Sequence, residues 1–429
     1  MTTSSHAPRM AGDGRREANA ATVLRTVLDH GPVARGAVAR LSGLSPAAVS
    51  RQTTDLTRLG LLRELPGPAG GGGVGRPQIP VDLHVGATGG PVVGGVHLGV
   101  PGSTFGLVDL RGRVLARRSY AHDGAAPAGR APGASGGPDI PGGPDGLPAA
   151  VARELREFLD EHARGRPLLG VGAAVGGWVD PAAGVVVRHD AFGWRRRPLA
   201  AELARGLGGH TVRLDNHARS IAQSEILFGR PEARRSLVHL FVGNVVDAAV
   251  GLAGVVHQGP GAAAGDVAHL PVPDSTVPCP CGRWGCLEAT ASNTALALTA
   301  VRRGIVPEPD TSLVVDAAAA GDRRADRLLR ERARAVGRAA ALLLDVLNPD
   351  LVVVTEQASI IEPAYLEEIR GAAIDLSHVC DDPERIVSPH AGPAALPVAA
   401  GTVLLNSLFR TPLQAVEELL GGVDRQSLG

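Results

Sequence analysis

The segment Pro278–Glu288 reads PCPCGRWGCLE and carries three of the chain's four cysteines, Cys279, Cys281 and Cys286. His269 lies ten positions before the first of them. One histidine and three cysteines supply the four ligands of a closed tetrahedral Zn²⁺ centre, and a centre with no open position is structural. The alternative is three buried thiols or a disulfide, but cysteines separated by one residue form a strained bridge. We therefore expect a structural zinc ion held by His269, Cys279, Cys281 and Cys286.

The composition bounds the class of protein. At 429 residues the chain exceeds what one hydrophobic core usually serves, so two or three domains are expected. Its 43 basic and 43 acidic residues give zero formal charge, which points to neither an acidic nor a basic partner. The first residues hold no apolar stretch of signal-peptide length, and the best apolar run, 339–347, is interrupted by Asp345. We expect a cytoplasmic protein that does not enter a membrane.

Helical periodicity marks the start of the chain. Apolar residues recur at helical spacing over 18–30 and again over 34–41. Ser45 followed by Pro46 is a helix N-cap and a first helical position, so a third helix is expected from there to about Leu59. Two short helices joined by a glycine-containing turn are typical of a helix-turn-helix.

Two short strands, 61–65 and 78–83, are expected to follow around a glycine-rich tip, which completes a winged helix-turn-helix over 18–84. The alternative is a small helical domain that binds a protein. Small and polar residues on the outer face of the third helix favour double-stranded operator DNA as the partner. The residues expected at the DNA are Ser45, Ala47, Ser50, Arg51 and Gln52 on the third helix and Arg76 on the wing.

The rest of the chain, 92–410, alternates between strands, glycine turns and helices. A three-stranded meander is expected over 92–118, and the later elements alternate as α/β units with mixed sheets. The run 121–148 is rich in Gly, Pro and Ala, and we expect it to be a disordered insertion. Residues 1–17 and 411–429 are expected to form tails.

Several motifs together carry a family resemblance. The string GDVAH (265–269) followed by the cysteine segment, the loop GVGAAVGGWVD (170–180), FGW (192–194) and LDN (214–216) resemble the ROK family, as does the N-terminal winged helix-turn-helix. That family includes sugar-responsive repressors and sugar kinases, and the resemblance covers about 18–410. It implies an actin-like, ribonuclease H-like pair of subdomains with a sugar pocket in the cleft, in a homodimer or homotetramer.

The resemblance also implies a set of sugar-binding residues. Family members hold a sugar's hydroxyls with the glutamate of a Glu-x-x-His motif, the zinc-ligand histidine, the glutamate after the last cysteine and an Asn-Asp pair. Carboxylates accept hydrogen bonds from vicinal hydroxyls, and zinc fixes the orientation of the imidazole. Asp266 is one methylene shorter than the family's glutamate, so the pocket is expected to differ there. The matching positions are Asn216, Asp266, His269 and Glu288.

Four departures from the kinase pattern separate the family's two activities. His217 stands where a ROK kinase has its aspartate base, and His97–Pro101 lacks the acidic residue of the first phosphate loop. Asn244–Asp247 replaces the glycines of the second loop, and Thr355–Gln357 replaces a Gly-Gly pair. We therefore expect a sugar-responsive repressor with no enzymatic activity. The rivals are a sugar kinase with an accessory DNA-binding head and a regulator that has lost sugar binding and responds to a protein partner.

Overall fold

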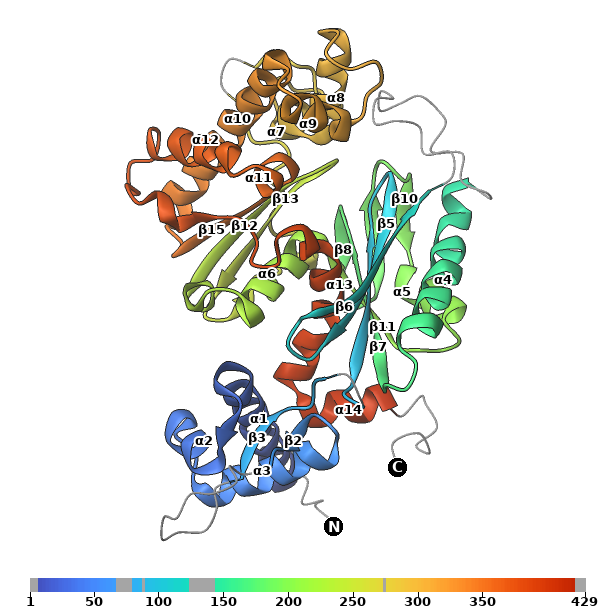
Figure 1. Cartoon of the computed structure of the whole chain (residues 1–429), viewed down its shortest axis with the longest axis vertical. Helices are drawn as coiled ribbons and strands as arrows, with labels where there is room; N and C mark the ends of the chain where they lie inside the picture. Colours follow the sequence, from blue (N-terminus) through green and yellow to red (C-terminus); the bar gives the residue numbers. More distant parts are fainter. Residues whose placement is uncertain (1–6, 67–78, 87–88, 123–142, 273–274, 421–429) are drawn as a thin grey trace, which may run out of the picture.

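The computed structural model describes residues 7–66, 79–86, 89–122, 143–272 and 275–420. An N-terminal head lies beneath two lobes that face one another, and one long helix runs between the lobes (Figure 1). The head consists of α1 (Ala7–His30), β1 (Val33–Ala34), α2 (Arg35–Ser42), α3 (Pro46–Arg58), β2 (Leu62–Glu64) and β3 (Pro80–Leu83).

The head has the arrangement of a winged helix-turn-helix. Its strands pair in the order β1-β3-β2, and Gly43, with a left-handed φ of 68°, ends α2 at the turn into α3. Ser45 caps α3 as its sequence predicts, because its side chain accepts a hydrogen bond from the backbone N–H of Ala48 at 3.2 Å. The strand β1 was not predicted, since two residues carry no periodicity.

The first lobe is built on a five-stranded sheet. The strands β4, β5 and β6 form an antiparallel meander, and β7 and β11 extend it as parallel strands. The order across the sheet is β11-β7-β4-β5-β6. The elements of this lobe are β4 (Val92–Leu98), β5 (Gly102–Asp109), β6 (Val114–Ala121), α4 (Gly143–His162), β7 (Leu168–Val175), β8 (Trp178–Asp180), β9 (Val185–His189), β10 (Trp194–Arg197), α5 (Leu199–Gly206) and β11 (Val212–Asn216).

The second lobe repeats the design, with a three-stranded meander and two parallel strands in the order β14-β13-β12-β15-β16. Two sheets of this design facing each other form the expected actin-like α/β fold. The second lobe and its connections contain α6 (His217–Phe228), η1 (Pro231–Arg234), β12 (Ser236–Val242), β13 (Val246–Leu252), β14 (Val255–Val256), η2 (Pro260–Ala262), α7 (Leu287–Ala291), α8 (Asn293–Arg302), α9 (Thr311–Ala319), α10 (Arg323–Leu347), β15 (Leu351–Glu356), α11 (Gln357–Ile361), α12 (Pro363–Ile374), η3 (Pro383–Arg385), β16 (Ile386–Val387), η4 (Gly392–Ala394), α13 (Ala395–Arg410) and α14 (Pro412–Leu420).

The helix α13 is the central element of the body. A Cβ on Gly172 of β7 would lie 1.9 Å from the carbonyl oxygen of Ala400, so only glycine lets α13 lie this close to the sheet. The segment Gly392–Arg410 is long and apolar enough to cross a membrane, but 67% of its most apolar stretch is buried inside the protein. Its hydropathy is therefore that of a core helix.

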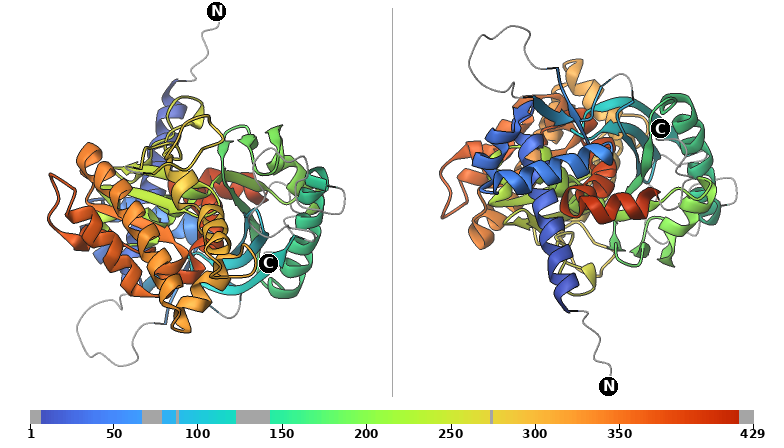
Figure 2. Two further views of the ribbon diagram at one scale, coloured as in Figure 1. Left: turned by 90° about the horizontal axis from the view of Figure 1, so that it is seen from above. Right: turned by 90° about the horizontal axis from the view of Figure 1, so that it is seen from below.

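The head and the body share one hydrophobic core. Apolar residues of α1 such as Val23 and Leu24 belong to the same buried cluster as Leu404 and Leu408 of α13 and Val416 of α14. Seen from below, α1 of the head lies beside α14 (Figure 2). The head is consequently held on the body by apolar packing as well as by the chain that joins them.

Both ends of the chain contain more helix than the sequence predicts. The expected tail 1–17 is shortened because α1 begins at Ala7. Within this helix Arg16 pairs with Asp55 of α3 at 2.9 Å. The expected tail 411–429 contains α14, whose backbone N–H at Leu413 donates to Glu17 Oε1 at 2.8 Å. Contacts between the two ends, which no local pattern reveals, stabilise these extra turns.

The expected insertion 121–148 is narrower on its C-terminal side. The helix α4 begins at Gly143, inside the expected insertion, and contains Pro148. The middle of the insertion, 123–142, lies outside the described residues.

Candidate functional site

The outer face of α3 carries most of the residues predicted to contact DNA. Ser45, Ala47, Ser50 and Arg51 are exposed there, and Ser45 also caps the helix. An exposed N-terminal half of the second helix is what a helix-turn-helix presents to a major groove. Arg76, the predicted wing contact, lies outside the described residues.

The prediction for Gln52 is wrong. Its side chain is only 3% exposed and its Oε1 atom is buried without a hydrogen-bond partner among the described residues. Position 52 follows Val49 by three and precedes Leu56 by four, so it falls on the same inward face of α3 as these core residues. Its polarity suggested an outward position that its helical spacing excludes.

The four predicted metal ligands come together. The ligand atoms of His269, Cys279, Cys281 and Cys286 all lie within 4.8 Å of one another. Cys281 Sγ is 3.6 Å from Cys286 Sγ, and Cys279 Sγ is 3.7 Å from His269 Nδ1. Tetrahedral Zn²⁺ with Zn–S bonds of about 2.3 Å requires ligand atoms about 3.7 Å apart. The cluster therefore has the donor set and the spacing of a metal centre.

The loop before this cluster is fixed to the second lobe. A Cβ on Gly265 would lie 1.9 Å from the carbonyl oxygen of Ala248 in β13, whose N–H donates to the Gly265 carbonyl at 2.8 Å. This close approach, with φ of 97°, requires glycine. Asp266 follows at an exposed position, where its Oδ1 accepts a hydrogen bond from the N–H of Ala268 at 3.3 Å.

Asn216 lies between the two lobes, at the start of α6. Its Oδ1 accepts hydrogen bonds from the N–H groups of Ala218 and Arg219, so it is the N-cap of the helix. Its Nδ2 donates to the Gly177 carbonyl at 2.8 Å and to Asp247 Oδ2 at 3.1 Å. The amide that was predicted to bind sugar therefore also links the first lobe, through Gly177, to the second, through Asp247.

Glu288 lies near the carboxylate of Asp247. Its Oε2 accepts a hydrogen bond from the N–H of Val246 at 3.1 Å. Burial raises the pKa of Glu288, and the negative charges of Asp247 and Asp266 raise it further, whereas His269 works in the opposite direction. The predicted residues Asp266, His269 and Glu288 are thus within electrostatic reach of one another.

Three buried histidines, His97, His189 and His217, lie near one another, and His97 stands in the segment that corresponds to the first phosphate loop. His97 Nε2 lies 3.3 Å from His217 Nδ1 and the two rings stack. Burial, together with the charge of His217, lowers the pKa of His97 to about 3. Burial lowers the pKa of His189 to about 4, again with a contribution from His217. The imidazoles of His97 and His189 are therefore neutral near pH 7.

Asp247 is the site residue that the sequence did not reveal. It was interpreted only as a charge in a degraded phosphate loop, yet its Oδ2 accepts from His217 Nε2 at 3.1 Å. Burial works to raise its pKa, but the hydrogen bonds from His217 and Asn216 outweigh burial, so the pKa of Asp247 is lowered. The position of Asp247 near α6 follows from the register of β13 against β12, which a short sequence pattern does not reveal.

The segment Thr355–Gln357 contains Glu356, which forms a buried ion pair with Arg332. Glu356 caps α11 and pairs with Arg332 at 2.5 Å, and both side chains are 3% exposed. Arg332 also donates to the carbonyl oxygen of Val242, directly before the second loop, and to Asn293 Oδ1. A charged pair that is this well hydrogen-bonded fixes the end of β15 against α8 and α10.

Comparison with known proteins gives matches over most of the chain. The ROK family model matches residues 93–383. Transcriptional regulator Rv0485 of Mycobacterium tuberculosis is 32% identical over 415 residues, which cover 92% of this chain and 87% of that protein. The xylose repressor of Caldicellulosiruptor bescii is 26% identical over 372 residues, which cover 83% of this chain and 87% of that protein.

Two solved structures share the fold. A ROK family transcriptional regulator described as a homologue of the Escherichia coli MLC protein aligns with a TM-score of 0.71 at 22% identity and covers 95% of this chain and 100% of that one. A ROK family glucokinase from Streptomyces griseus, in complex with glucose and AMPPNP, aligns with a TM-score of 0.60 at 23% identity and covers 72% of this chain and 98% of that one. At these identities the likeness concerns the fold alone.

Proposed function

The chain belongs to the ROK family, and from this premise we propose that it is a sugar-responsive transcriptional repressor that binds operator DNA and transfers no phosphate. Relatives that match it over most of their length bear the names of a transcriptional regulator and a xylose repressor. A regulator of this kind acts on the chromosome, which assigns it to the cytoplasm.

The observation that carries the proposal is the course of α6. The helix starts at the cap residue Asn216 in the cleft, and near its other end the carbonyl oxygen of Ile226 accepts a hydrogen bond from Arg25 of α1 at 2.7 Å. Arg234, just beyond α6, makes two 2.8 Å hydrogen bonds to Asp29 of α1. A ligand that shifts the start of α6 thereby acts on a helix joined to the head, as allosteric coupling requires.

The DNA contacts are assigned to the exposed face of α3 and to the wing. Ser45 and the first N–H groups of α3 suit a phosphate. Ser50 and Arg51, with Ala47 beside them, suit base edges. Arg76 suits the minor groove or a phosphate. We infer a homodimer or homotetramer, because a two-fold pair of heads reads half-sites about 10 base pairs or a multiple apart.

The effector site is assigned to Asn216, Asp266, His269 and Glu288, with Asp247 added from the geometry. Three carboxylates, an amide and an imidazole offer several acceptors and few donors, which suits the hydroxyls of a neutral sugar. The carboxylates come from different loops, so a polyol that bridges them draws the loop 265–269 and the start of α7 toward α6.

Zinc is assigned to His269, Cys279, Cys281 and Cys286, whose donor types and spacing fit it. When bound, the ion supplies structural cross-linking rather than chemistry, because four protein ligands leave no open position. His269 presents Nδ1 to the thiols, which leaves Nε2 for a sugar hydroxyl. Glu288 follows Cys286 by two residues, so the same cross-link positions both of these effector contacts.

The absence of kinase activity is supported by what fills the phosphate-binding positions. His97 is hydrogen-bonded to His217 in place of an acidic residue that would organise Mg²⁺. Asp247 brings a negative charge to the second loop, and Glu356 is fixed by Arg332 where the kinases have glycine. A nucleotide phosphate would therefore meet the carboxylates of Asp247 and Glu356 in these loops.

One observation favours the rival, a sugar kinase. The His217 imidazole is hydrogen-bonded to Asp247, and a carboxylate behind a histidine is a common general-base arrangement. ATP turnover with a panel of hexoses, pentoses and N-acetylhexosamines separates the two functions. Turnover at ordinary enzyme rates, above about 1 s⁻¹, would establish the kinase.

The repressor is tested by selecting genomic DNA fragments that the purified chain binds and then titrating sugars into the complexes. We expect fragments that share an inverted repeat and a sugar that changes their affinity about fivefold or more. Selection with the Arg51→Ala variant is the matched control. Equal enrichment by both proteins, or a repeat whose affinity no sugar alters, contradicts the proposal in its DNA or its sugar part respectively.

A further inference from the structure

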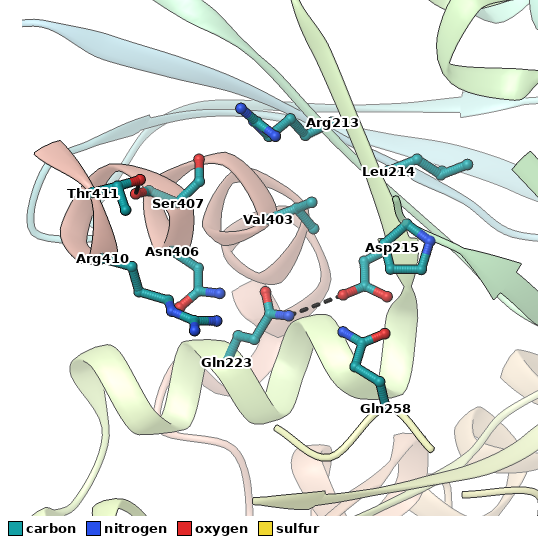
Figure 3. Close-up of a pocket in the computed structure, with 11 residues that line it drawn as sticks. Arg213, Leu214, Asp215, Gln223, Gln258, Val403, Asn406, Ser407, Arg410 and Thr411 are labelled. Atoms are coloured by element: carbon teal, nitrogen blue, oxygen red, sulfur yellow. Dashed lines mark hydrogen bonds between the residues drawn. The ribbon is translucent and has the colours of Figure 1, made fainter. Parts of the chain in front are cut away.

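A cavity of about 300 Å³ lies between α13, α6 and β11 (Figure 3). Its polar walls come from Gln223 of α6, Arg213 and Asp215 of β11, and Asn406 and Arg410 of the last turns of α13. None of these residues belongs to the proposed sugar site. The volume is at the lower end of the range for small-molecule sites, about 300–1,000 Å³.

Gln223 leaves a hydrogen-bond acceptor unpaired at this cavity. The side chain is 7% exposed, and its Nε2 donates to Asp215 Oδ2 at 2.9 Å. Because the carboxylate only accepts, this bond fixes the orientation of the amide. Oε1 is then buried with no partner among the described residues. An acceptor left in this state is unfavourable, so a ligand that donates a hydrogen bond to it is favoured.

Arg213 leaves a donor unpaired at the same cavity. Its Nη2 donates to Glu418 of α14 at 2.5 Å, whereas its Nε is buried and has no partner within the described part of the chain. Two residues that line this cavity therefore each hold a buried polar atom without a partner among the described residues. Figure 3 shows Gln223 between Asp215 on one side and Asn406 and Arg410 on the other.

The charges around the cavity leave one positive charge uncompensated. Asp215 is paired with Arg219 at 2.7 Å, and Arg213 is paired with Glu418. Arg410 is exposed and lines the cavity, and no acidic partner for it occurs among the described residues. An anionic group next to Arg410 would complete the balance.

From this arrangement we propose that the cavity is a second effector site for a small hydroxylated anion, such as a sugar acid or a sugar phosphate. A hydroxyl of the ligand donates to Gln223 Oε1, and its anionic group accepts hydrogen bonds from Arg410. A neutral sugar satisfies only the first contact, and inorganic phosphate fits the second without occupying the remaining volume.

The position of the cavity gives such a ligand a route to the head. Arg410 is the last residue of α13, and Leu413 of α14 donates its N–H to Glu17 of α1 three residues later. Arg213 is linked to the same helix α14 through Glu418. A ligand held at Arg410 therefore acts on the junction of α13 and α14, and through α14 on α1, by a path separate from that of α6.

The test is calorimetric titration of the full chain with D-gluconate, glucose 6-phosphate, inorganic phosphate and D-glucose. We expect one of the two hydroxylated anions to bind with a stoichiometry of one per chain. Arg410→Ala and Gln223→Met should each weaken that binding about tenfold or more, since each removes one polar partner. Arg327→Ala, which removes an exposed guanidinium of α10, should leave it unchanged, and so should Glu288→Gln in the sugar site.

Three results would overturn the proposal. One is that neither hydroxylated anion binds. Another is that their binding is lost in Glu288→Gln and kept in Arg410→Ala, which would locate them in the sugar site. The third is that inorganic phosphate binds as tightly as the hydroxylated anions, which would remove the role of Gln223. Arg410 is exposed, so its variant keeps the test valid even where Gln223→Met unfolds the protein, which thermal unfolding would reveal.

Discussion

Nε2 of His217 lies 3.1 Å from Oδ2 of Asp247, and this hydrogen bond joins the first residue of α6 to the strand β13 of the second lobe. Asn216 donates to the same oxygen. One carboxylate therefore holds both residues at the start of the helix that reaches the head. A sugar hydroxyl that competes for Asp247 would release that helix, which connects effector binding with the position of the DNA-binding surface.

We predict that Arg234→Ala separates sugar binding from DNA release. Arg234 pairs with Asp29 of the head, whereas its neighbour Arg235 pairs with Asp350 of the second lobe, both in ion pairs of 2.7–2.8 Å. The Arg234 variant should bind sugar normally while the sugar-induced change in DNA affinity falls severalfold. Arg235→Ala is the matched control and should behave as the wild type in fluorescence anisotropy. Equal loss of response in both variants would argue against the α6 route.

The face of α3 predicts different outcomes for two adjacent substitutions. Arg51→Ala should weaken operator binding about tenfold or more with unchanged stability, because Arg51 is exposed and makes one charged contact. Gln52→Ala should instead lower the midpoint of thermal unfolding, because Gln52 is buried between Val49 and Leu56. The residual DNA affinity of the folded Gln52 variant should be close to that of the wild type. An Arg51 variant with full affinity would place the DNA on another surface.

These two residues also illustrate what the sequence can and cannot reveal. Contacts within a few residues are encoded locally, so the cap at Ser45 and the cysteine cluster could be predicted from spacing alone. The burial of Gln52 was accessible from its distance to Val49 and Leu56, but its polarity was given more weight than its position. The role of Asp247 depends on strand register and on the packing of α6, which no short pattern contains.

Removal of the metal should affect the sugar response before DNA binding. Cys281→Ser removes one ligand of the cluster on its exposed side, whereas Cys380→Ser changes a cysteine in a separate core position. We expect the first variant to lose bound zinc and about tenfold or more in sugar affinity, because the loop that carries His269 and Glu288 loses its cross-link. Zinc content and calorimetric sugar titration measure both effects. Full sugar affinity in a zinc-free Cys281 variant would mean that the ion has no part in sensing.

Acid should destabilise the protein through its buried histidines. The pKa values of His97 and His239 are lowered to about 3 and that of His189 to about 4, mainly by burial. Because each folded value lies below the unfolded value of about 6.5, the unfolded chain binds more protons between these limits. The contribution to stability is therefore present above about pH 6.5 and is lost as the pH falls toward 4.

The loss is measured by urea unfolding at pH 7.5 and 5.5. Each of these histidines should lower the free energy of unfolding by up to about 1.4 kcal/mol between the two conditions. His97→Gln, which keeps a polar side chain of similar size, should reduce the difference by one histidine's share. The same pH difference in wild type and variant would show that His97 does not titrate in this way.

Restoring the kinase aspartate should not restore a kinase. In His217→Asp the new carboxylate would face Asp247, so the two negative charges repel each other and one of them takes up a proton, which weakens the intended base. His97 would still stand in the first phosphate loop, and Glu356 would still be paired with Arg332 beside the second. We expect no ATP turnover above background with any sugar of the panel, measured by coupled ADP release beside an active ROK glucokinase.

The double variant His217→Asp with Asp247→Gly removes the repulsion and should also stay inactive, because the first loop remains without its acidic residue. Turnover in either variant would show that the remaining loops can position a nucleotide, and the family's two activities would then differ in this chain by the residues around α6 alone.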